Sequence, residues 1–338
     1  MDKKDGGRKR LTMESIKEYL DGSTILITGG TGSFGRALTE RILSISENAR
    51  IVIYSRDEYK QYLMKQDFHD AVARNQLSFI IGDVRDRNKL VMACRPVDFI
   101  FHAAALKQVP TCEENIEECI LTNINGAVNV RFAAEMSKVK KVVALSTDKA
   151  VQPVNLYGAT KMVSDKVFTD VSTASGTVFC IVRYGNVASS RGSVIPFFQK
   201  IKSKGVHLYP VTDPKMTRFW ISLSEAVSLA LTALSDSSGG ETYIAKLPSF
   251  RIVDLVSAID SQGQIDIVGV RPGEKLHEIM ITQYDAPKTV DYGTYFVIYP
   301  TLELAHIGSG TQVPNMYSYS SDTNDDWLTI EEIRKKLE

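Results

Sequence analysis

Two acid–base pairs lie close together between residues 145 and 161, a stretch that reads Leu-Ser-Thr-Asp-Lys-Ala-Val-Gln-Pro-Val-Asn-Leu-Tyr-Gly-Ala-Thr-Lys. The second pair, Tyr157 and Lys161, has the i, i+4 spacing of neighbours on one face of a helix. An ammonium group in that position can lower the pKa of a phenol. The pair therefore predicts a tyrosine that acts as a general base near neutral pH.

The first pair, Asp148 and Lys149, follows an apolar run that is expected to be the end of a strand. Adjacent side chains of a regular strand point to opposite faces, so both can serve one site only if the backbone becomes irregular after Thr147. Pro153 and Gly158 favour such a break. A simple salt bridge between the two side chains is the alternative interpretation.

A glycine-rich turn near the N-terminus stands between an expected strand, which begins at residue 23, and an expected helix at 36–43. Its glycines recur at every third position, which suits a tight turn, close approach of the backbone to a pyrophosphate, and a helix N-terminus that faces negative charge. We therefore expect a dinucleotide cofactor here, bound by Thr28, Gly29, Thr31, Gly32, Ser33, Phe34 and Gly35.

The second expected strand, 50–54, ends in Ser55, Arg56 and Asp57, and these residues bear on the type of cofactor. An NAD site usually has an acidic side chain at the end of this strand, which binds the ribose 2′-hydroxyl, whereas a 2′-phosphate needs a cation and small donors. Ser55 and Arg56 favour NADP. Asp57 leaves NAD open as the alternative.

Two more expected strands end in residues that could line the cofactor. Strand 77–81 leads into Asp83 and Val84, and strand 98–101 leads through His102 into Ala103, Ala104 and Ala105. Small residues after a parallel strand let a flat cofactor lie against the backbone, whereas His102 is interpreted as a packed core histidine. Lys107 lies past the carboxyl end of a strand, where open α/β sheets bind ligands, so it fits a substrate contact or a solvated lysine equally well.

Periodicity and breaker residues predict the remaining elements. Helices are expected at 13–20, 117–136, 156–171, 223–234 and 251–259, and a further helix is expected to open at 271–277. Strands are expected at 179–184 and 241–246. From residue 284 onward the chain is expected to be polar and irregular, except for an extended patch at 295–299.

Composition excludes several functional classes. The 40 basic and 40 acidic residues of the 338 cancel, so bulk charge does not indicate a nucleic-acid or membrane partner. The four cysteines lack paired spacing and the five histidines are scattered, which predicts no metal site and no disulfide framework. Apolar runs are only strand-sized and no signal-type segment is seen, so we expect a cytoplasmic protein.

Repeated β-α units with a glycine turn at the first crossover predict an α/β fold: a doubly wound parallel sheet of the Rossmann type with a smaller C-terminal substrate domain. The expected division has three parts. They are an N-terminal extension (1–22), a cofactor-binding domain (23–186 and about 217–246) and a substrate-binding domain (about 187–216 and 247–338).

With Tyr157 and Lys161 placed after the fifth strand, the chain resembles the extended short-chain dehydrogenase/reductases. Six separated motifs narrow the resemblance to the UDP-N-acetylglucosamine 4,6-dehydratases, in particular the configuration-inverting type of pseudaminic acid biosynthesis. They are residues 147–149, 155–161, 183–187, 190–194, 216–220 and 271–278. Related dehydratases that retain the configuration have methionine in place of Tyr157, so the tyrosine favours inversion at C5.

The resemblance implies NADP as cofactor, UDP-N-acetylglucosamine as substrate, and a homo-oligomer. It implies that Tyr157 and Lys161 contact the cofactor, with the nicotinamide beside Tyr157. It also implies substrate contacts from Lys107, Thr147, Asn186, Arg191, Arg218, Arg271 and Glu274. Arginines suit this role because a diphosphate calls for bidentate, permanently charged donors.

The implied reaction oxidises C4 of the sugar, which acidifies the C5 proton, then eliminates water across C5 and C6, and finally returns the hydride from the cofactor to C6. Tyr157, with Lys161, would take the C4 hydroxyl proton, Lys149 the C5 proton, and Asp148 would protonate the leaving C6 hydroxyl. Lys149 must then be neutral and Asp148 protonated when each acts, and an ion pair between them opposes both demands.

Two other functions compete with this one. A UDP-sugar 4-epimerase or dehydrogenase of the same fold needs the tyrosine, the lysine and the cofactor, but no second acid–base pair, so Asp148 and Lys149 argue against it. A non-catalytic protein that senses NADP would tolerate the loss of Tyr157 or Lys161, and both are present.

Overall fold

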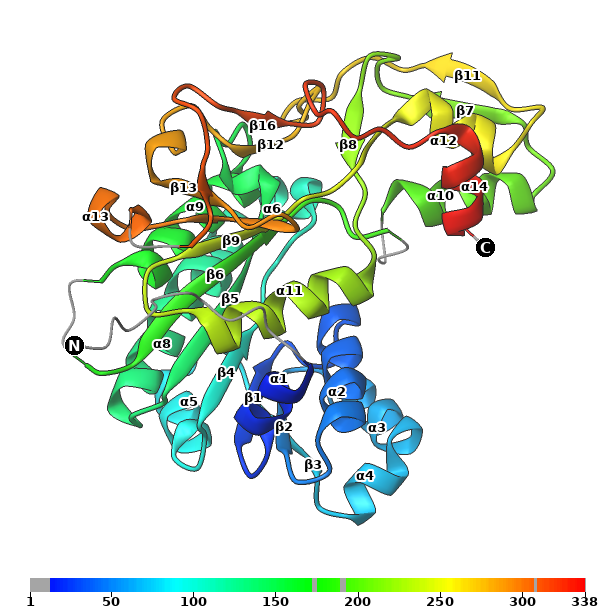
Figure 1. Cartoon of the computed structure of the whole chain (residues 1–338). Coiled ribbons are helices and arrows are strands. Elements are labelled where there is room, and N and C mark those ends of the chain that lie inside the picture. The colour runs from blue at the N-terminus through cyan, green and yellow to red at the C-terminus, as the bar shows by residue number, and fades with distance from the viewer. Residues whose placement is uncertain (1–12, 172–174, 189–192, 307–308, 338) are drawn as a thin grey trace.

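A single large sheet forms the centre of the computed structural model, which describes residues 13–171, 175–188, 193–306 and 309–337 (Figure 1). Within those residues the sheet has ten strands in the order β15-β13-β14-β9-β6-β5-β4-β1-β2-β3. Seven strands run parallel: β1 (Thr24–Thr28), β2 (Arg50–Ser55), β3 (Leu77–Ile81), β4 (Phe99–His102), β5 (Lys141–Thr147), β6 (Val178–Tyr184) and β9 (Thr242–Ala245). The order from β3 to β6 is that of a doubly wound dinucleotide-binding sheet, so the predicted fold class is confirmed.

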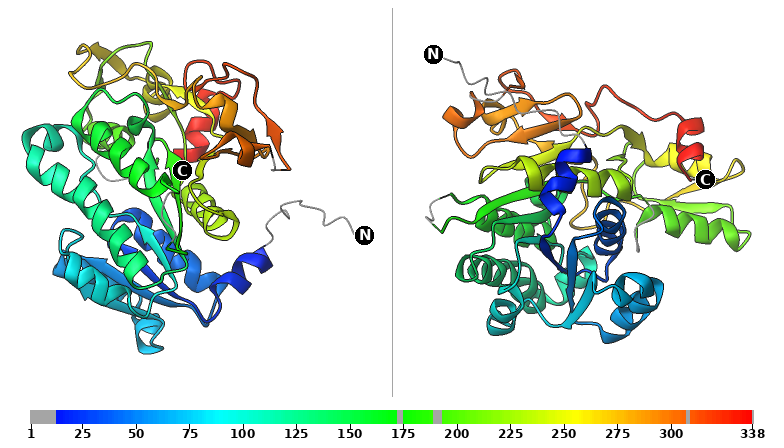
Figure 2. Two further views of the ribbon diagram at one scale, coloured as in Figure 1. Left: turned by 90° about the vertical axis from the view of Figure 1, so that its left-hand side faces the viewer. Right: turned by 60° about the horizontal axis from the view of Figure 1, so that its bottom comes forward.

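Helices cover both faces of the sheet, as the turned views of Figure 2 show. One face packs against α1 (Met13–Leu20), α2 (Ser33–Ile45), α3 (Glu58–Asp67), α4 (His69–Ala73) and α11 (Leu223–Asp236). The other face packs against α5 (Arg87–Cys94), α8 (Gly126–Met136) and α9 (Leu156–Thr169). Because both faces are covered, strands such as β1 are apolar at consecutive positions, with Ile25, Leu26 and Ile27 fully buried.

The helical stretch that was expected at 117–136 is present as three consecutive pieces. They are α7 (Ile116–Ile120), a π-helical turn η1 (Leu121–Asn125) and α8. A short helix, α6 (Val109–Glu114), precedes them. Asn123 in the π turn is buried, and its amide bonds both the N–H and the carbonyl of Leu106, so it holds the segment that follows β4.

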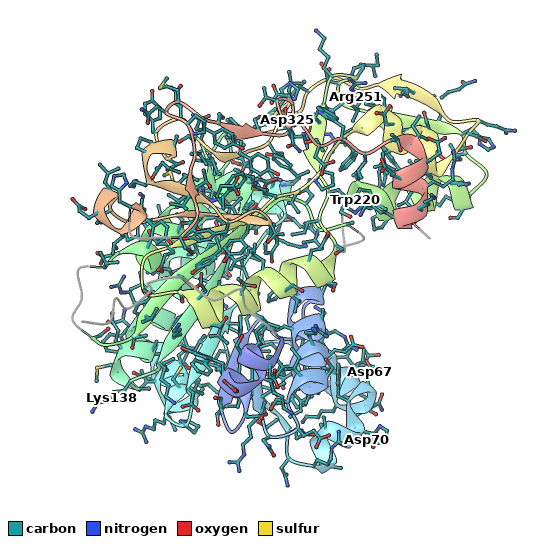
Figure 3. All side chains as sticks on the ribbon, viewed as in Figure 1. Asp67, Asp70, Lys138, Trp220, Arg251 and Asp325 are labelled. Atoms are coloured by element: carbon teal, nitrogen blue, oxygen red, sulfur yellow. The ribbon has the colours of Figure 1, made fainter. Side chains whose placement is uncertain are left out.

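A smaller body contains α10 (Val194–Ser203), α12 (Ile252–Ile259), α14 (Ile330–Leu337) and the parallel pair β7 (Leu208–Val211) and β11 (Gln264–Ile267). Its own apolar core includes Phe198, Tyr209, Leu255 and Ile333. Trp220, labelled in Figure 3, belongs to the same core and packs edge to face on Phe250, with ring centroids 5.5 Å apart. The antiparallel pair β8 (Thr217–Phe219) and β10 (Ser249–Arg251) connects it to the rest of the chain.

The helix expected at 271–277 is absent. Pro272 and Gly273 form a turn instead, in which Gly273 has a φ of +81° and Glu274 N–H donates to Arg271 O at 3.1 Å. An irregular segment then leads into β12 (Ile279–Ile281), which pairs with β16 (Tyr319–Ser320).

The region after residue 284 is more regular than expected. It holds η3 (Ala286–Lys288), β13 (Thr289–Asp291), β14 (Tyr295–Ile298), α13 (Leu302–Ala305) and β15 (Thr311–Gln312). The three strands continue the large sheet in antiparallel fashion beyond β9. The extended patch at 295–299 is therefore confirmed as β14, but part of the segment 247–338 belongs to the large sheet. Strands this short show little periodicity in their sequence. Whether such a segment forms a strand depends on the strand that it pairs with.

Candidate active site

The glycine turn after β1 forms a cradle of backbone. Gly29 has a φ of +67°, and a Cβ there would lie 2.8 Å from the backbone nitrogen of Ala104. Gly32 caps α2 without any side-chain hydrogen bond, so no capping side chain takes up the N–H groups of the first helical turn. The helix begins at Ser33, ahead of the predicted start at residue 36, because this turn leads directly into it. Backbone N–H groups and an open helix N-terminus fit the phosphates of a dinucleotide, and the Ala103–Ala105 segment closes one side.

The interpretation of His102 as a core histidine is confirmed. Its Nδ1 is 2.7 Å from Thr28 Oγ1, both residues are buried, and burial lowers the pKa of His102 to about 3. The ring is therefore neutral across the physiological range. The Thr28 hydroxyl is bound to this ring, while Phe34 stacks on Tyr184 at 6.4 Å between centroids.

The three residues at the end of β2 that could distinguish NADP from NAD have different partners. Asp57 caps α3, where its carboxylate accepts from Lys60 N–H at 2.9 Å and pairs with Lys60 Nζ at 2.8 Å. Ser55 Oγ accepts from Gln61. Arg56 keeps half of its side chain exposed and lies 3.7 Å from Asp83. The carboxylate of Asp57 is thus bound locally. Arg56 and Arg85 both lie beside Asp83, and Arg56 is the more exposed of the two.

The predicted break after Thr147 is confirmed. β5 ends at Thr147, and residues Asp148–Ala150 form a 3₁₀ turn, η2, so Asp148 and Lys149 no longer alternate between faces. The turn packs directly on α9, because a Cβ at Gly158 would lie only 2.2 Å from Lys149 O. Asn155 caps α9 and accepts from Gly158 N–H at 2.8 Å.

The Lys149 ammonium lies among three acceptors. Its Nζ donates to Asp148 Oδ1 (3.1 Å), Asn186 Oδ1 (3.0 Å) and Glu278 Oε1 (3.2 Å). Asp148 is 1% exposed and Glu278 is 2% exposed. The salt bridge that was considered as an alternative is therefore present, and it is part of a larger buried cluster.

The cluster shifts the pKa values of its members in different directions. Burial raises the pKa of Asp148, the charge of Glu278 raises it further, and Lys149 opposes both only in part. Burial lowers the pKa of Lys149, but Asp148 and Glu278 together outweigh burial, so the net shift is upward. The first of the two demands of the elimination, a protonated acid, is favoured by the environment. The second, a neutral lysine, is opposed by it.

Tyr157 and Lys161 are both buried on α9, and the ammonium of Lys161 is bound to the backbone. Lys161 Nζ donates to Leu145 O at 2.7 Å, and burial lowers its own pKa. Burial raises the pKa of Tyr157, and the charge of Lys149 and a hydrogen bond with Thr147 lower it to a smaller extent. The net shift of the Tyr157 pKa is upward, and the predicted lowering of that pKa by Lys161 stays a prediction.

The residues predicted to bind substrate are only partly brought together. Asn186 contacts Lys149, Thr147 Oγ1 donates to Asp148 at 2.9 Å, and the charge of Lys149 adds to desolvation in lowering the pKa of Lys107. Arg271 is exposed in its turn, whereas Glu274 has one buried oxygen. Arg191 lies outside the described residues.

Arg218 is buried, and its guanidinium group binds other groups of this protein. It donates to the carbonyls of Thr217 (2.7 Å), Leu276 (3.0 Å) and Lys275 (3.1 Å), and its Nε lies 3.4 Å from Glu278. It thereby anchors the irregular segment that replaces the expected helix. Its contact with a diphosphate stays a prediction.

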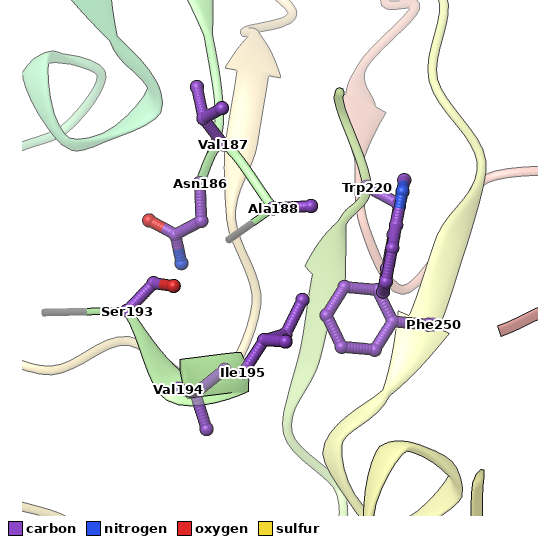
Figure 4. A pocket seen from close by; sticks show the side chains of 8 residues that line it. All are labelled: Asn186, Val187, Ala188, Ser193, Val194, Ile195, Trp220 and Phe250. Carbon is purple, nitrogen blue, oxygen red and sulfur yellow. The ribbon is translucent and has the colours of Figure 1, made fainter. Parts of the chain in front are cut away.

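A mainly apolar pocket borders Asn186 (Figure 4). The side chains of Ile195, Trp220 and Phe250 line it opposite Asn186 and Ser193. The hydroxyl of Ser193 is buried without a hydrogen-bond partner in the described part of the chain.

Glu278 is the residue that sequence reasoning missed. It stands at the end of the motif 271–278, just after the stretch that was expected to open a helix, and no partner was expected for it. Its carboxylate lies in the same motif as Arg271 and Glu274, which were predicted to bind substrate, and this position could have marked it as a site residue.

The described residues lack two further features. They contain no helix long and apolar enough to cross a membrane, and no cluster of three or more His, Cys, Asp or Glu side chains arranged to hold a metal ion.

Known proteins resemble the chain over most of its length. A family model described as polysaccharide biosynthesis protein matches residues 25–300. A UDP-N-acetylglucosamine 4,6-dehydratase (inverting) of Campylobacter jejuni subsp. jejuni serotype O:23/36 (strain 81-176) is 46% identical over 93% of this chain and 96% of its own length. A UDP-glucose 4-epimerase of Rickettsia canadensis (strain McKiel) is 44% identical over 81% of this chain and 82% of its own.

One solved structure is also similar throughout. The X-ray structure of Pen from Bacillus thuringiensis superimposes with a TM-score of 0.86 at 34% identity, covering 94% of this chain and 98% of that one.

Proposed function

The chain belongs to the polysaccharide biosynthesis protein family, within the extended short-chain dehydrogenase/reductases, and on that premise we propose that it is a UDP-N-acetylglucosamine 4,6-dehydratase that inverts C5. The product would be UDP-2-acetamido-2,6-dideoxy-β-L-arabino-hex-4-ulose. The observation that carries the proposal is the acid–base pair that stands in addition to Tyr157 and Lys161: Asp148 and Lys149 lie together on η2, and Lys149 is close enough to Tyr157 to act on its pKa. Elimination of water needs such a pair, whereas oxidation alone does not.

The chemistry sets the order in which these residues act. Hydroxide at C6 is a poor leaving group and the C5 proton is not acidic until C4 is a ketone. Tyr157 receives the C4 hydroxyl proton, Lys149 takes the C5 proton, and Asp148 gives a proton to the departing C6 oxygen. Reprotonation of C5 from the opposite face inverts that carbon. Bound NADP supplies the hydride acceptor for C4 and the hydride that returns to C6.

Asp148 is suited to the acid role. Its Oδ2 is buried and has no hydrogen-bond partner in the described part of the chain, and burial raises its pKa. A protonated carboxyl with one oxygen unbound can present its proton to a leaving hydroxyl group. Lys149 donates to both carboxylates and to Asn186, so proton acceptors lie beside it when it must become neutral.

NADP rather than NAD is supported by the end of β2. A 2′-phosphate needs a cation, and Arg56 is half exposed there while Asp57 is bound to α3. The glycine cradle and the N-terminus of α2 would hold the pyrophosphate.

A 4-epimerase is the second candidate, because the Rickettsia canadensis relative bears that name at 44% identity. A dehydratase that retains C5 is a variant of the first. Incubation with UDP-N-acetylglucosamine followed by NMR distinguishes the three outcomes. A 4-keto-6-deoxy sugar with inverted C5 supports the proposal, the same sugar with retained C5 supports the variant, and the 4-epimer supports the epimerase.

We also infer a homo-oligomer that works in the cytoplasm. Apolar side chains stay exposed along α8 and α9, among them Val128, Phe132 and Met162, which suits association between copies. The four cysteines are free and buried, as in a reducing compartment.

Light scattering during gel filtration tests the association between copies: a monomeric mass would contradict it. A role in pseudaminic acid biosynthesis is the further proposal, and it depends on the inverted product.

A further inference from the structure

Glu278 is held rigidly at the centre of the acid–base cluster. Its N–H donates to Ser321 Oγ at 2.9 Å, and its carbonyl accepts from Ser321 N–H at 2.9 Å. Its carboxylate Oε1 reaches Lys149 Nζ (3.2 Å) and Arg218 Nε (3.4 Å), while Oε2 is buried without a hydrogen-bond partner in the described residues. The main chain therefore fixes where this charge lies.

Two carboxylates share one ammonium. Asp148 Oδ1 and Glu278 Oε1 both lie within 3.2 Å of Lys149 Nζ. Like charges so close in a buried site cannot both ionise freely, and each also favours the charged form of the lysine between them. The protonation of Asp148 and that of Lys149 therefore depend on the charge of Glu278.

Other charged groups surround this cluster from several elements. Arg218 on β8 and Lys275 ahead of β12 add positive charge, and Lys275 Nζ donates to Val151 O. Lys107 after β4 and the phenol of Tyr157 on α9 also interact with Lys149. Arg218 is the cation that contacts Glu278 in addition to Lys149, which leaves Glu278 the anchored anion and Asp148 the carboxyl that can change its charge.

We propose that Glu278 is a positioning residue that sets the protonation states of the Asp148–Lys149 pair through the ammonium that it shares with Asp148. The inference rests on the proposed function. Glu278 touches neither the sugar carbon nor the leaving oxygen in this scheme. Its negative charge keeps Asp148 in the acid form, and it retains the proton on Lys149 until the substrate is in place.

Removing the charge must move both titrations in one direction. Without the repulsion from Glu278 the pKa of Asp148 falls, and without its attraction the pKa of Lys149 falls as well. The pH profile of elimination has one limb for each group, so the whole profile shifts toward acid. A charge at this distance shifts a pKa by about one unit or more.

The test compares Glu278→Gln with wild type in the pH dependence of kcat for 4-keto-6-deoxy product formation. The variant is expected to shift both limbs to lower pH by about one unit or more. Glu241→Gln is the matched control, since Glu241 is equally buried at 2% exposure but accepts from Ser238 and Gly239 N–H groups before β9. It should lower stability and leave the profile where it is.

Glu278→Asp completes the series, because its shorter side chain withdraws the charge without removing it. It should give an intermediate shift, and it decides the matter if Glu278→Gln does not fold. A lower kcat with limbs that superimpose on those of wild type would mean a merely structural role and would overturn the inference. If wild type itself forms no 4-keto product, the proposed function fails and the inference falls with it; unshifted limbs in an active enzyme refute the inference alone.

Discussion

Replacing Gly158 by alanine should damage catalysis through shape, without touching any catalytic side chain. Gly158 lies in the first turn of α9, and a Cβ there would lie 2.2 Å from Lys149 O, against 3.4 Å or more in ordinary contact. The atom that it meets is backbone, so η2 and α9 must separate by about 1 Å. Overpacking of this kind costs about 1–3 kcal/mol of stability.

The same displacement moves Asp148 and Lys149 relative to Tyr157. Misplacement of reacting groups by about 1 Å can cost on the order of 100-fold in rate. We therefore expect Gly158→Ala to fold with a melting temperature several degrees lower and to form 4-keto product about 100-fold more slowly. NADPH binding should change little, because the glycine cradle lies after a different strand.

The assay combines NMR of product formation, thermal unfolding and a fluorescence titration of NADPH. Lys166→Ala is the control, since Lys166 is exposed on the same helix. A Gly158→Ala protein that keeps kcat within about threefold of wild type would refute the reasoning, because the turn would then tolerate a separation that should disturb the pair. Loss of NADPH binding along with activity would also refute it, since the damage would then be global.

Four further outcomes are expected. Asp148→Asn should slow elimination by about 10²–10⁴-fold, measured by NMR. Folding raises the pKa of Asp148. The contribution of this carboxyl to stability is therefore full below its pKa in the unfolded chain and is lost as pH rises through its pKa in the folded protein. Above about pH 4, the melting temperature of Asp148→Asn should rise relative to that of wild type. Arg56→Ala should weaken NADP binding about tenfold and leave NAD binding unchanged in a fluorescence titration, since one charged contact to a phosphate is worth about 1.4 kcal/mol or more. Product formed in heavy water should carry deuterium at C5, and a C5 proton retained from the substrate would exclude removal of that proton by Lys149.

Much of the fold follows from local sequence. The glycine turn, the apolar strands and the helix at Tyr157 each depend on residues within a few positions of one another, so their type could be predicted. The 3₁₀ break after Thr147 was predictable for the same reason, because only an irregular backbone lets Asp148 and Lys149 serve one site. The segment at 271–277 was predicted wrongly. Its backbone is held by Arg218 from β8, a partner that local pattern does not contain.

The residue types and spacings determined which groups could do chemistry: a tyrosine with a lysine one helical turn away, and an acid beside a second lysine. Only the tertiary structure decided which charged groups lie near the tyrosine, the acid and the two lysines. Lys161 donates to Leu145 O, the charge of Lys149 acts on the pKa of Tyr157, and Glu278 contacts Lys149 across 129 positions of sequence. The physical reason is that a pKa depends on the sum of burial and nearby charges, and in a buried site those charges come from elements that the chain brings together only on folding.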